Sequence, residues 1–133
     1  MQLLEHVHVN VNSIAATCAF LQRALPQMKI RGSGEVAEYG SWLHIGDAHS
    51  YIALTEVCGA KPAAELRHIG LVVDDIEALI ERLQSAGITA SDQSELDSHP
   101  HRRRVYYVDD NGLDWEFVQY LSEDFSERND YSL

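Results

Sequence analysis

The sequence predicts an α+β fold of two βαβββ modules whose strands form a cupped, mixed β-sheet. Two observations predict it. His6 and His68 lie 62 positions apart, and each opens a short apolar strand that runs directly into a capped helix. Each helix is followed by further short strands, and internal repetition of this kind is a signal about the whole fold. At 133 residues the chain can form one domain with a sizeable core.

The first module is expected over residues 4–58. Residues 4–11 alternate weakly and are rich in valine, which predicts a strand. Asn12 or Ser13 can cap a helix that continues to about residue 25, where a proline follows and ends it. The remaining strands of this module are predicted at Glu35–Tyr39, Trp42–Ile45 and Tyr51–Val57, the last two joined by a turn at 46–49.

After a linker at residues 59–65, the second module is expected over residues 66–121. It opens with the strand His68–Val73 and continues into an amphipathic helix from about Asp75 to Ala86, which Gly87 ends. The remaining strands are predicted at Ile88–Ala90, Arg103–Val108 and Leu113–Tyr120, the last two joined by a turn at Asp109–Gly112. A polar, acidic tail at 122–133 is expected to be loosely held.

The bulk properties exclude several classes of partner. A formal net charge of −11 argues against binding to a nucleic-acid backbone. No apolar run approaches the roughly 20 residues that a membrane span needs, and no secretory signal is evident. Cys18 and Cys58 lack the spacing of a zinc site, so we expect reduced thiols in a cytoplasmic protein. The expected partner is a small molecule.

Two stretches of the second module carry the most specific pattern. One is His68-Ile69-Gly70-Leu71-Val72-Val73-Asp74-Asp75, the strand that opens on a histidine. The other is Asp109-Asp110-Asn111-Gly112-Leu113-Asp114-Trp115-Glu116-Phe117, a turn followed four residues later by a glutamate. With a one-residue insertion, Trp42–Leu54 overlays Val105–Phe117, so that Ala53 stands where the second module has Glu116.

In these motifs the chain resembles the vicinal oxygen chelate superfamily, which includes glyoxalase I, extradiol dioxygenases, and fosfomycin- and bleomycin-resistance proteins. The resemblance covers about residues 4–121. It implies that His6, His68 and Glu116 bind a divalent metal, because the family takes its ligands from the first and last strands of each module. Two imidazoles and a carboxylate suit Fe(II), Mn(II), Ni(II) or Zn(II). The resemblance also implies a homodimer.

The fourth ligand position of the family falls on Ala53, which cannot bind a metal. This departure counts against glyoxalase I and its four-ligand relatives, so we expect little glyoxalase activity. It favours the three-ligand members, and hence a metal-dependent dioxygenase, lyase or transferase acting on a small oxygenated substrate. Glu56 is a poor substitute for the missing ligand, because three residues along a strand it should point to the other face.

Four further residues are candidates for the surroundings of the metal. His8 should share a strand face with His6 and is the first candidate for an acid–base group, although a role in lining the pocket is the simpler reading. His44 and Tyr107 occupy equivalent places before the two hairpin turns and could bind substrate. Asp114 should lie on the face of the glutamate ligand, from which it could hold a ligand histidine.

The alternative function is a non-catalytic binding protein of the bleomycin-resistance type, which would sequester a cationic small molecule in the cup. The net charge favours this alternative, whereas the complete set of two histidines and one glutamate disfavours it. The run Arg102-Arg103-Arg104 is expected to form a solvated face, with anion binding as the second possibility.

Overall fold

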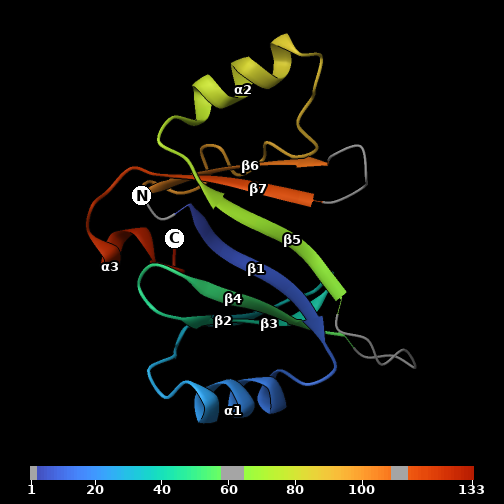
Figure 1. Ribbon diagram of the computed structural model, residues 1–133, viewed down its shortest axis with the longest axis vertical. Coiled ribbons are helices and arrows are strands. Elements are labelled where there is room, and N and C mark those ends of the chain that lie inside the picture. Colours follow the sequence, from blue (N-terminus) through green and yellow to red (C-terminus); the bar gives the residue numbers. More distant parts are fainter. Residues whose placement is uncertain (1–2, 58–64, 109–113) are drawn as a thin grey trace. The chain divides into compact units, whose positions relative to one another are not determined.

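The computed structural model describes residues 3–57, 65–108 and 114–133. The chain divides into an N-terminal unit, His6–Arg67, and a C-terminal unit, which consists of Met1–Glu5 and His68–Leu133. Each unit combines a mixed sheet with a helix on one of its faces, which confirms the predicted α+β class (Figure 1). Among the described residues, no helix is long and apolar enough to cross a membrane.

The N-terminal unit has the predicted βαβββ order. Its strands lie in the order β2-β3-β4-β1, with β1 parallel to β4 and the other pairs antiparallel. β2 starts six residues before the predicted strand, because its pairing with β3 extends back through Gly34 and Gly32 to Lys29. The elements are β1 (Leu4–Val11), α1 (Ile14–Ala24), β2 (Lys29–Val36), β3 (Gly40–Gly46) and β4 (Tyr51–Glu56).

The core of the N-terminal unit lies between α1 and the sheet. Ser13 begins the helix, since its Oγ accepts a hydrogen bond from the Ala16 backbone N–H at 3.1 Å. Ile14 and Cys18 then pack against Ile45 and Leu54 on the strands. Alternation along β1 and β4 therefore sends the residues between these core positions to the opposite face of the sheet, away from α1.

The C-terminal unit repeats this arrangement with one strand fewer. Its strand order is β5-β7-β6, with β5 parallel to β7 and β6 antiparallel to it. The helix α2 covers the face where Ile76 and Leu79 pack on Val105 and Tyr107 (Figure 1). The elements are β5 (Glu65–Val72), α2 (Ile76–Ser85), β6 (Arg102–Val108), β7 (Asp114–Tyr120) and the short helix α3 (Phe125–Arg128).

The predicted strand Ile88–Ala90 does not form. The chain there is irregular, and it follows the outer edge of β6 through single hydrogen bonds, such as Tyr106 N–H to Asp92 O at 3.0 Å and Arg104 N–H to Glu95 O at 3.2 Å. This segment of residues 87–101, called the edge loop below, therefore covers the outer edge of β6. The predicted turn Asp109–Gly112, Cys58 and most of the linker lie outside the described residues.

Each helix is attached to its sheet by one equivalent hydrogen bond. Glu56 Oε2 accepts from the Ile14 N–H at 2.9 Å, and Gln119 Oε1 accepts from the Ile76 N–H at 3.1 Å. The acceptor lies in the last strand of its unit and the donor is the first residue of the helix. Glu56 thus points to the helix face, as predicted, and caps one of the free N–H groups of α1.

The C-terminal tail packs against the sheet, and the expectation of a loosely held tail is wrong. His99 Nε2 donates to the Asp130 carbonyl at 2.9 Å, while Arg102 donates from Nη1 to the Arg128 carbonyl at 3.3 Å. Arg128 also places its guanidinium carbon 3.8 Å from the ring centre of Tyr120. These contacts involve backbone carbonyls and an aromatic face, which a polar composition does not disclose.

The turn between β3 and β4 requires glycine at position 46. A Cβ added to Gly46 would collide with the Ser50 carbonyl and lie 2.5 Å from Tyr51 Cα. We therefore expect Gly46→Ala to lower the free energy of unfolding by about 3 kcal/mol in urea denaturation. Gly87→Ala is the matched control: its φ of 77° is unfavourable but its Cβ would meet nothing within 4 Å, so about 1 kcal/mol should be lost. Equal losses in the two variants would contradict this account.

His99 should make stability depend on pH. Its Nδ1 accepts from the His101 N–H at 3.0 Å and its Nε2 donates to Asp130, so the folded protein holds the neutral ring. Burial lowers the pKa of His99 below its ordinary value. The unfolded state then binds a proton that the folded state excludes. The contribution of neutral His99 to the free energy of unfolding is therefore complete above about pH 6.5, the ordinary pKa of histidine. It is lost as the pH falls from there through the lower pKa of His99 in the folded state.

The measurement is urea denaturation of the wild type and of His99→Gln between pH 5 and pH 8. The difference in unfolding free energy between the two proteins should shrink as the pH falls. A difference that is constant, or that grows towards acid, would contradict the assignment of a neutral His99.

Candidate functional site

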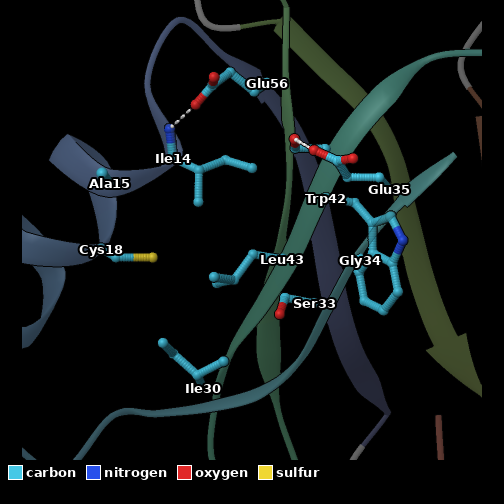
Figure 2. A pocket seen from close by; sticks show the side chains of 11 residues that line it. Ile14, Ala15, Cys18, Ile30, Ser33, Gly34, Glu35, Trp42, Leu43 and Glu56 are labelled. Atoms are coloured by element: carbon cyan, nitrogen blue, oxygen red, sulfur yellow. Dashed lines mark hydrogen bonds between the residues drawn. The ribbon is translucent and has the colours of Figure 1, made fainter. Parts of the chain in front are cut away.

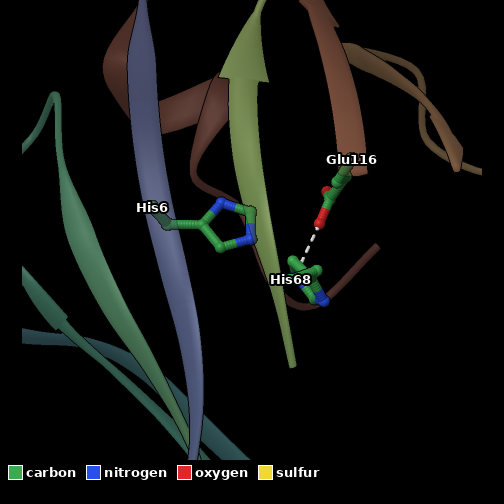
Figure 3. Close-up of side chains that lie close together, drawn as sticks. All are labelled: His6, His68 and Glu116. Carbon is green, nitrogen blue, oxygen red and sulfur yellow. Dashed lines mark ion pairs between the residues drawn. The ribbon is translucent and has the colours of Figure 1, made fainter. Parts of the chain in front are cut away.

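A buried histidine–glutamate pair forms the centre of the candidate site in the C-terminal unit. His68 on β5 and Glu116 on the neighbouring strand β7 place Nε2 and Oε2 2.9 Å apart (Figure 3). The side chains are 15% and 3% exposed, respectively. Burial of a carboxylate is costly unless a positive group lies beside it. The pair is thus a position where a proton on His68 or a bound metal cation would help to balance the charge of Glu116.

Three further side chains continue from Glu116 on the same face. Arg104 on β6 lies with Nη1 3.9 Å from Glu116 Oε1, and its Nη2 is 3.0 Å from Glu95 Oε1. The Tyr106 hydroxyl donates to the other oxygen of Glu95 at 2.9 Å. The Tyr106 ring meets His68 edge-on, with centroids 5.9 Å apart. Histidine, glutamate, arginine, glutamate and tyrosine therefore form one connected polar network.

The Tyr106 phenol is held in its protonated form. Burial raises its pKa well above the ordinary value, and the nearby charge of Glu116 raises it further. A phenol in this state is a stable hydrogen-bond donor across the physiological pH range. Tyr106 can therefore donate a hydrogen bond to Glu95, or to a ligand oxygen, without itself losing a proton.

Tyr106, rather than the predicted Tyr107, belongs to this face. The strand register pairs Tyr106 with Glu116, just as it pairs His44 with Ala53 in the N-terminal unit. Tyr107 instead packs in the core beneath α2 and meets Phe117 edge-on at 6.0 Å. The sequence overlay had placed the inserted residue before β6, whereas the register places it between β6 and β7. A one-residue slip of this kind moves every side chain to the other face.

The other repeat equivalences hold. His6 pairs with Tyr51, and His68 pairs with Asp114, so the two histidines occupy the same place in their units. Asp114 is exposed and shares the strand face of Glu116, two residues away. Among the described residues, no hydrogen bond joins Asp114 to a histidine, so its predicted role in holding a ligand stays a prediction.

In the N-terminal unit the predicted residues surround an aromatic stack. His6 lies on β1 (Figure 3) and is 3% exposed. Its ring stacks on Tyr51, with centroids 4.6 Å apart and planes 17° apart. His44 stacks on the same tyrosine at 4.4 Å. Arg31 lies over the Tyr51 ring at 4.1 Å. His6 and His44 thus share one face of this unit, as their predicted roles require.

His8 lies on the same face as His6, and its Nε2 is 2.8 Å from the Thr55 hydroxyl oxygen. Its neighbour in register is Ala53, which is 2% exposed. Ala53 therefore occupies the buried position that Glu116 occupies in the other unit, and it offers no ligand atom there. The first unit contributes histidines to its face but no carboxylate at the equivalent place.

A separate pocket of about 530 Å³ lies in the N-terminal unit, between α1 and the strands β2 and β3. Figure 2 shows Ile14, Cys18 and Leu43 lining it on the helix side, with Trp42 beyond the strand. None of the seven predicted site residues lines it. The pocket therefore lies apart from the histidine face of this unit.

Sequence reasoning missed Tyr106, Glu95 and Arg104 as members of the network. Alternation could have found Tyr106 and Arg104, had the hairpin been aligned by its strand pairing and not by the outer sequence match. Glu95 carried no signal, because it belongs to the irregular edge loop and its position depends on how that loop follows β6.

The comparisons with known proteins agree with this geometry. The sequence matches the profile of the Glyoxalase/Bleomycin resistance protein/Dioxygenase superfamily over residues 3–117, and the chain belongs to that superfamily. No curated protein matches the sequence significantly.

Solved structures share the fold. A methylmalonyl-CoA epimerase from Mycobacterium tuberculosis has a TM-score of 0.70 and 16% identity, over 91% of this chain and 89% of that one. The Streptomyces coelicolor methylmalonyl-CoA epimerase in complex with 2-nitronate-propionyl-CoA has a TM-score of 0.65 and 18% identity, over 92% and 99%. A hypothetical protein from Bacillus halodurans C-125 has a TM-score of 0.66 and 17% identity, over 91% of this chain and 96% of that one. Identities this low establish the fold alone.

Tyr106 and Tyr107 provide a direct test of the register. We expect Tyr106→Phe to lower the free energy of unfolding by about 1 kcal/mol, because the half-buried Glu95 carboxylate loses a donor. Tyr107→Phe should cost less than about 0.5 kcal/mol, since no hydrogen bond of its hydroxyl is found among the described residues. Urea denaturation of both variants measures the difference. The reverse order would show that Tyr107 faces the network.

Proposed function

We propose that the chain is a metal-dependent enzyme acting on a small oxygenated substrate, with His6, His68 and Glu116 as the metal ligands. His6, His68 and Glu116 carry the donor types that a divalent ion requires, two imidazole nitrogens and a carboxylate. The observation that carries the proposal is the His68–Glu116 pair: its ligand atoms lie 2.9 Å apart, and Glu116 is almost fully buried. Fe(II), Mn(II), Ni(II) and Zn(II) all suit these donors.

The residues fit a metal on chemical grounds. The imidazole of His68 presents Nε2 to the carboxylate, and a shared proton or a shared cation would each neutralise Glu116. A carboxylate with this little exposure is normally a functional or a paired group. When bound, the metal would supply Lewis acidity towards vicinal oxygens of the substrate. The Tyr106 phenol and Arg104 would supply a hydrogen bond and a positive charge on the same face.

Ala53 supports the three-ligand members of the superfamily as the closer parallel. It is buried at the place in register where the other unit has Glu116, which supports a site without the fourth ligand of the family. A three-ligand site leaves positions for substrate and for water or O₂. This favours dioxygenase, lyase or transferase chemistry over that of glyoxalase I. His8, held by Thr55, is the acid–base group in this proposal.

The aromatic stack supports a second candidate function, a non-catalytic binding protein of the bleomycin-resistance type. His6, Tyr51 and His44 form a row of stacked rings, on which a flat ligand could lie. The net charge of −11 would favour a cationic ligand. Metal dependence separates the two candidates, because this second function needs no metal. The homodimer stays a prediction, which light scattering of the purified protein would test.

We expect protein purified without chelator to contain about one divalent metal ion per chain, measured by elemental analysis. His68→Ala and Glu116→Gln should each weaken metal affinity by at least about 100-fold, because even residues behind the ligands contribute 10- to 100-fold. His49→Ala, at an exposed histidine in the turn before β4, is the matched control and should bind metal normally. Added metal should raise the melting temperature of the control but not of the two ligand variants.

The absence of stoichiometric metal, with unchanged ligand binding in His68→Ala, would exclude the enzyme proposal and favour the binding protein. Methylmalonyl-CoA belongs in the substrate panel, because two of the similar structures are methylmalonyl-CoA epimerases. Rapid glyoxalase turnover would contradict the role assigned to Ala53.

A further inference from the structure

We propose that Arg102 and Arg128 form an anion-binding site on the Glu116 face of the C-terminal unit, and that a carboxylate or phosphate group of the substrate binds there. The role of this anion as part of a substrate rests on the proposed function. Binding of an anion to the two arginines does not, because it requires no metal.

The three consecutive arginines of β6 differ sharply in their partners. Arg103 points to the helix side, where its Nη2 lies 2.7 Å from Glu77 Oε1 on α2. Arg104 lies 3.0 Å from Glu95. Arg102 has no carboxylate partner among the described residues, and its Nη1 donates only to the Arg128 backbone carbonyl. The expectation of a solvated face is therefore wrong for Arg102, which is 8% exposed.

Both arginines retain buried hydrogen-bonding capacity. Within the part of the chain that the structure describes, the Nε atoms of Arg102 and Arg128 are buried and have no hydrogen-bond partner. Aromatic rings offset part of the cost: Arg102 lies 5.1 Å from the Tyr131 ring centre, and Arg128 lies 3.8 Å from that of Tyr120. A buried guanidinium without an acidic partner is otherwise expensive, and an oxyanion supplies both the charge and the acceptors.

Register and ring contacts place both side chains at the face that carries Glu116. The register pairs Arg102 with Tyr120 and Tyr106 with Glu116, so Arg102 lies on the same side of the sheet as Glu116. Arg128 reaches Tyr120 from α3, which follows β7. Of the ten basic residues of an acidic chain, Arg102 and Arg104 thus lie on one face of β6, and Arg128 lies beside Tyr120 from α3.

This placement defines the shape of the ligand. Glu116 and Tyr120 are four residues apart on β7, which corresponds to about 14 Å along an extended strand. A substrate that reaches both ends would be elongated, with its metal-chelating oxygens at one end and an anionic group roughly 10–14 Å away. A compact molecule of two or three carbons could not occupy both positions.

The tail also has attachments that do not involve these arginines. The tail is already attached by the hydrogen bond from His99 to the Asp130 carbonyl, and α3 is capped by Asp124, whose Oδ1 accepts from the Ser126 N–H at 2.8 Å. These bonds need neither guanidinium. A neutral N–H or O–H donor could also satisfy the Arg128 carbonyl, so this hydrogen bond alone does not explain the positive charges of the two arginines.

The test is calorimetric titration of the metal-free, full-length protein with inorganic phosphate and, separately, with malonate at low salt. The wild type should bind at least one of the two saturably, and the stronger of them identifies the phosphate or carboxylate class. Arg128→Met should weaken that binding about tenfold or more, since hydrogen bonds to charged groups are lost. Arg128→Lys should weaken it less, because it keeps the charge. Arg103→Met is the matched control on the opposite face and should bind like the wild type.

Two results would overturn the proposal: no saturable binding of either probe by the wild type, or equal affinity in Arg128→Met. Arg102→Met should also weaken anion binding. If that variant does not fold, the two variants of the half-buried Arg128 are sufficient for the test. His68→Ala separates the two proposals, since it should lose metal and keep phosphate or malonate binding. If the wild type binds the anion but does not bind a divalent metal when metal is added, the proposed function is excluded and the anion site is still supported.

Discussion

The register of the parallel strand pairs is the constraint on which the site depends. In each unit the first strand pairs with the last at equivalent residues, His6 with Tyr51 and His68 with Asp114. This pairing sends the histidines and Glu116 to one face, while the intervening residues pack beneath a helix. A slip of one residue would bury Glu116 among aliphatic side chains and expose the core. Hydrophobic burial under α1 and α2 therefore determines where the polar chemistry lies.

The electrostatics of the C-terminal unit differ from those of the chain as a whole. An overall charge of −11 describes the solvated surface, but the buried carboxylate of Glu116 is surrounded by His68, Arg104 and a neutral phenol. Net charge alone favours a cationic ligand, whereas the ligands proposed for this face are oxygen-rich and anionic. Local arrangement is the better guide, because exposed charges are screened within about 10 Å and buried ones are not.

Periodicity and the internal repeat were sufficient to predict the fold class, both long helices and the strands β1, β3, β4, β5, β6 and β7. They also placed His68 on the first strand and Glu116 on the last strand of the second module, and the structure pairs these two side chains. Tyr106 was missed because an insertion cannot be placed within a hairpin without its hydrogen bonds, and a one-residue error changes the face. Glu95 and the tail were missed because irregular chain is positioned by backbone carbonyls and rings, which have no periodic sequence pattern.

The acidic groups at the N-termini of α1 and α2 come from different parts of the chain. α2 begins with the acidic cap Asp75 and has Glu77 in its first turn, and its distant acceptor, Gln119, is neutral. α1 has a neutral cap and no acidic residue in its first turn, and its distant acceptor is Glu56, 42 positions away. The negative charge that a helix N-terminus favours is thus local in one unit and long-range in the other. In folding, α2 carries this charge before any strand forms, whereas α1 acquires it only after β4 has joined β1.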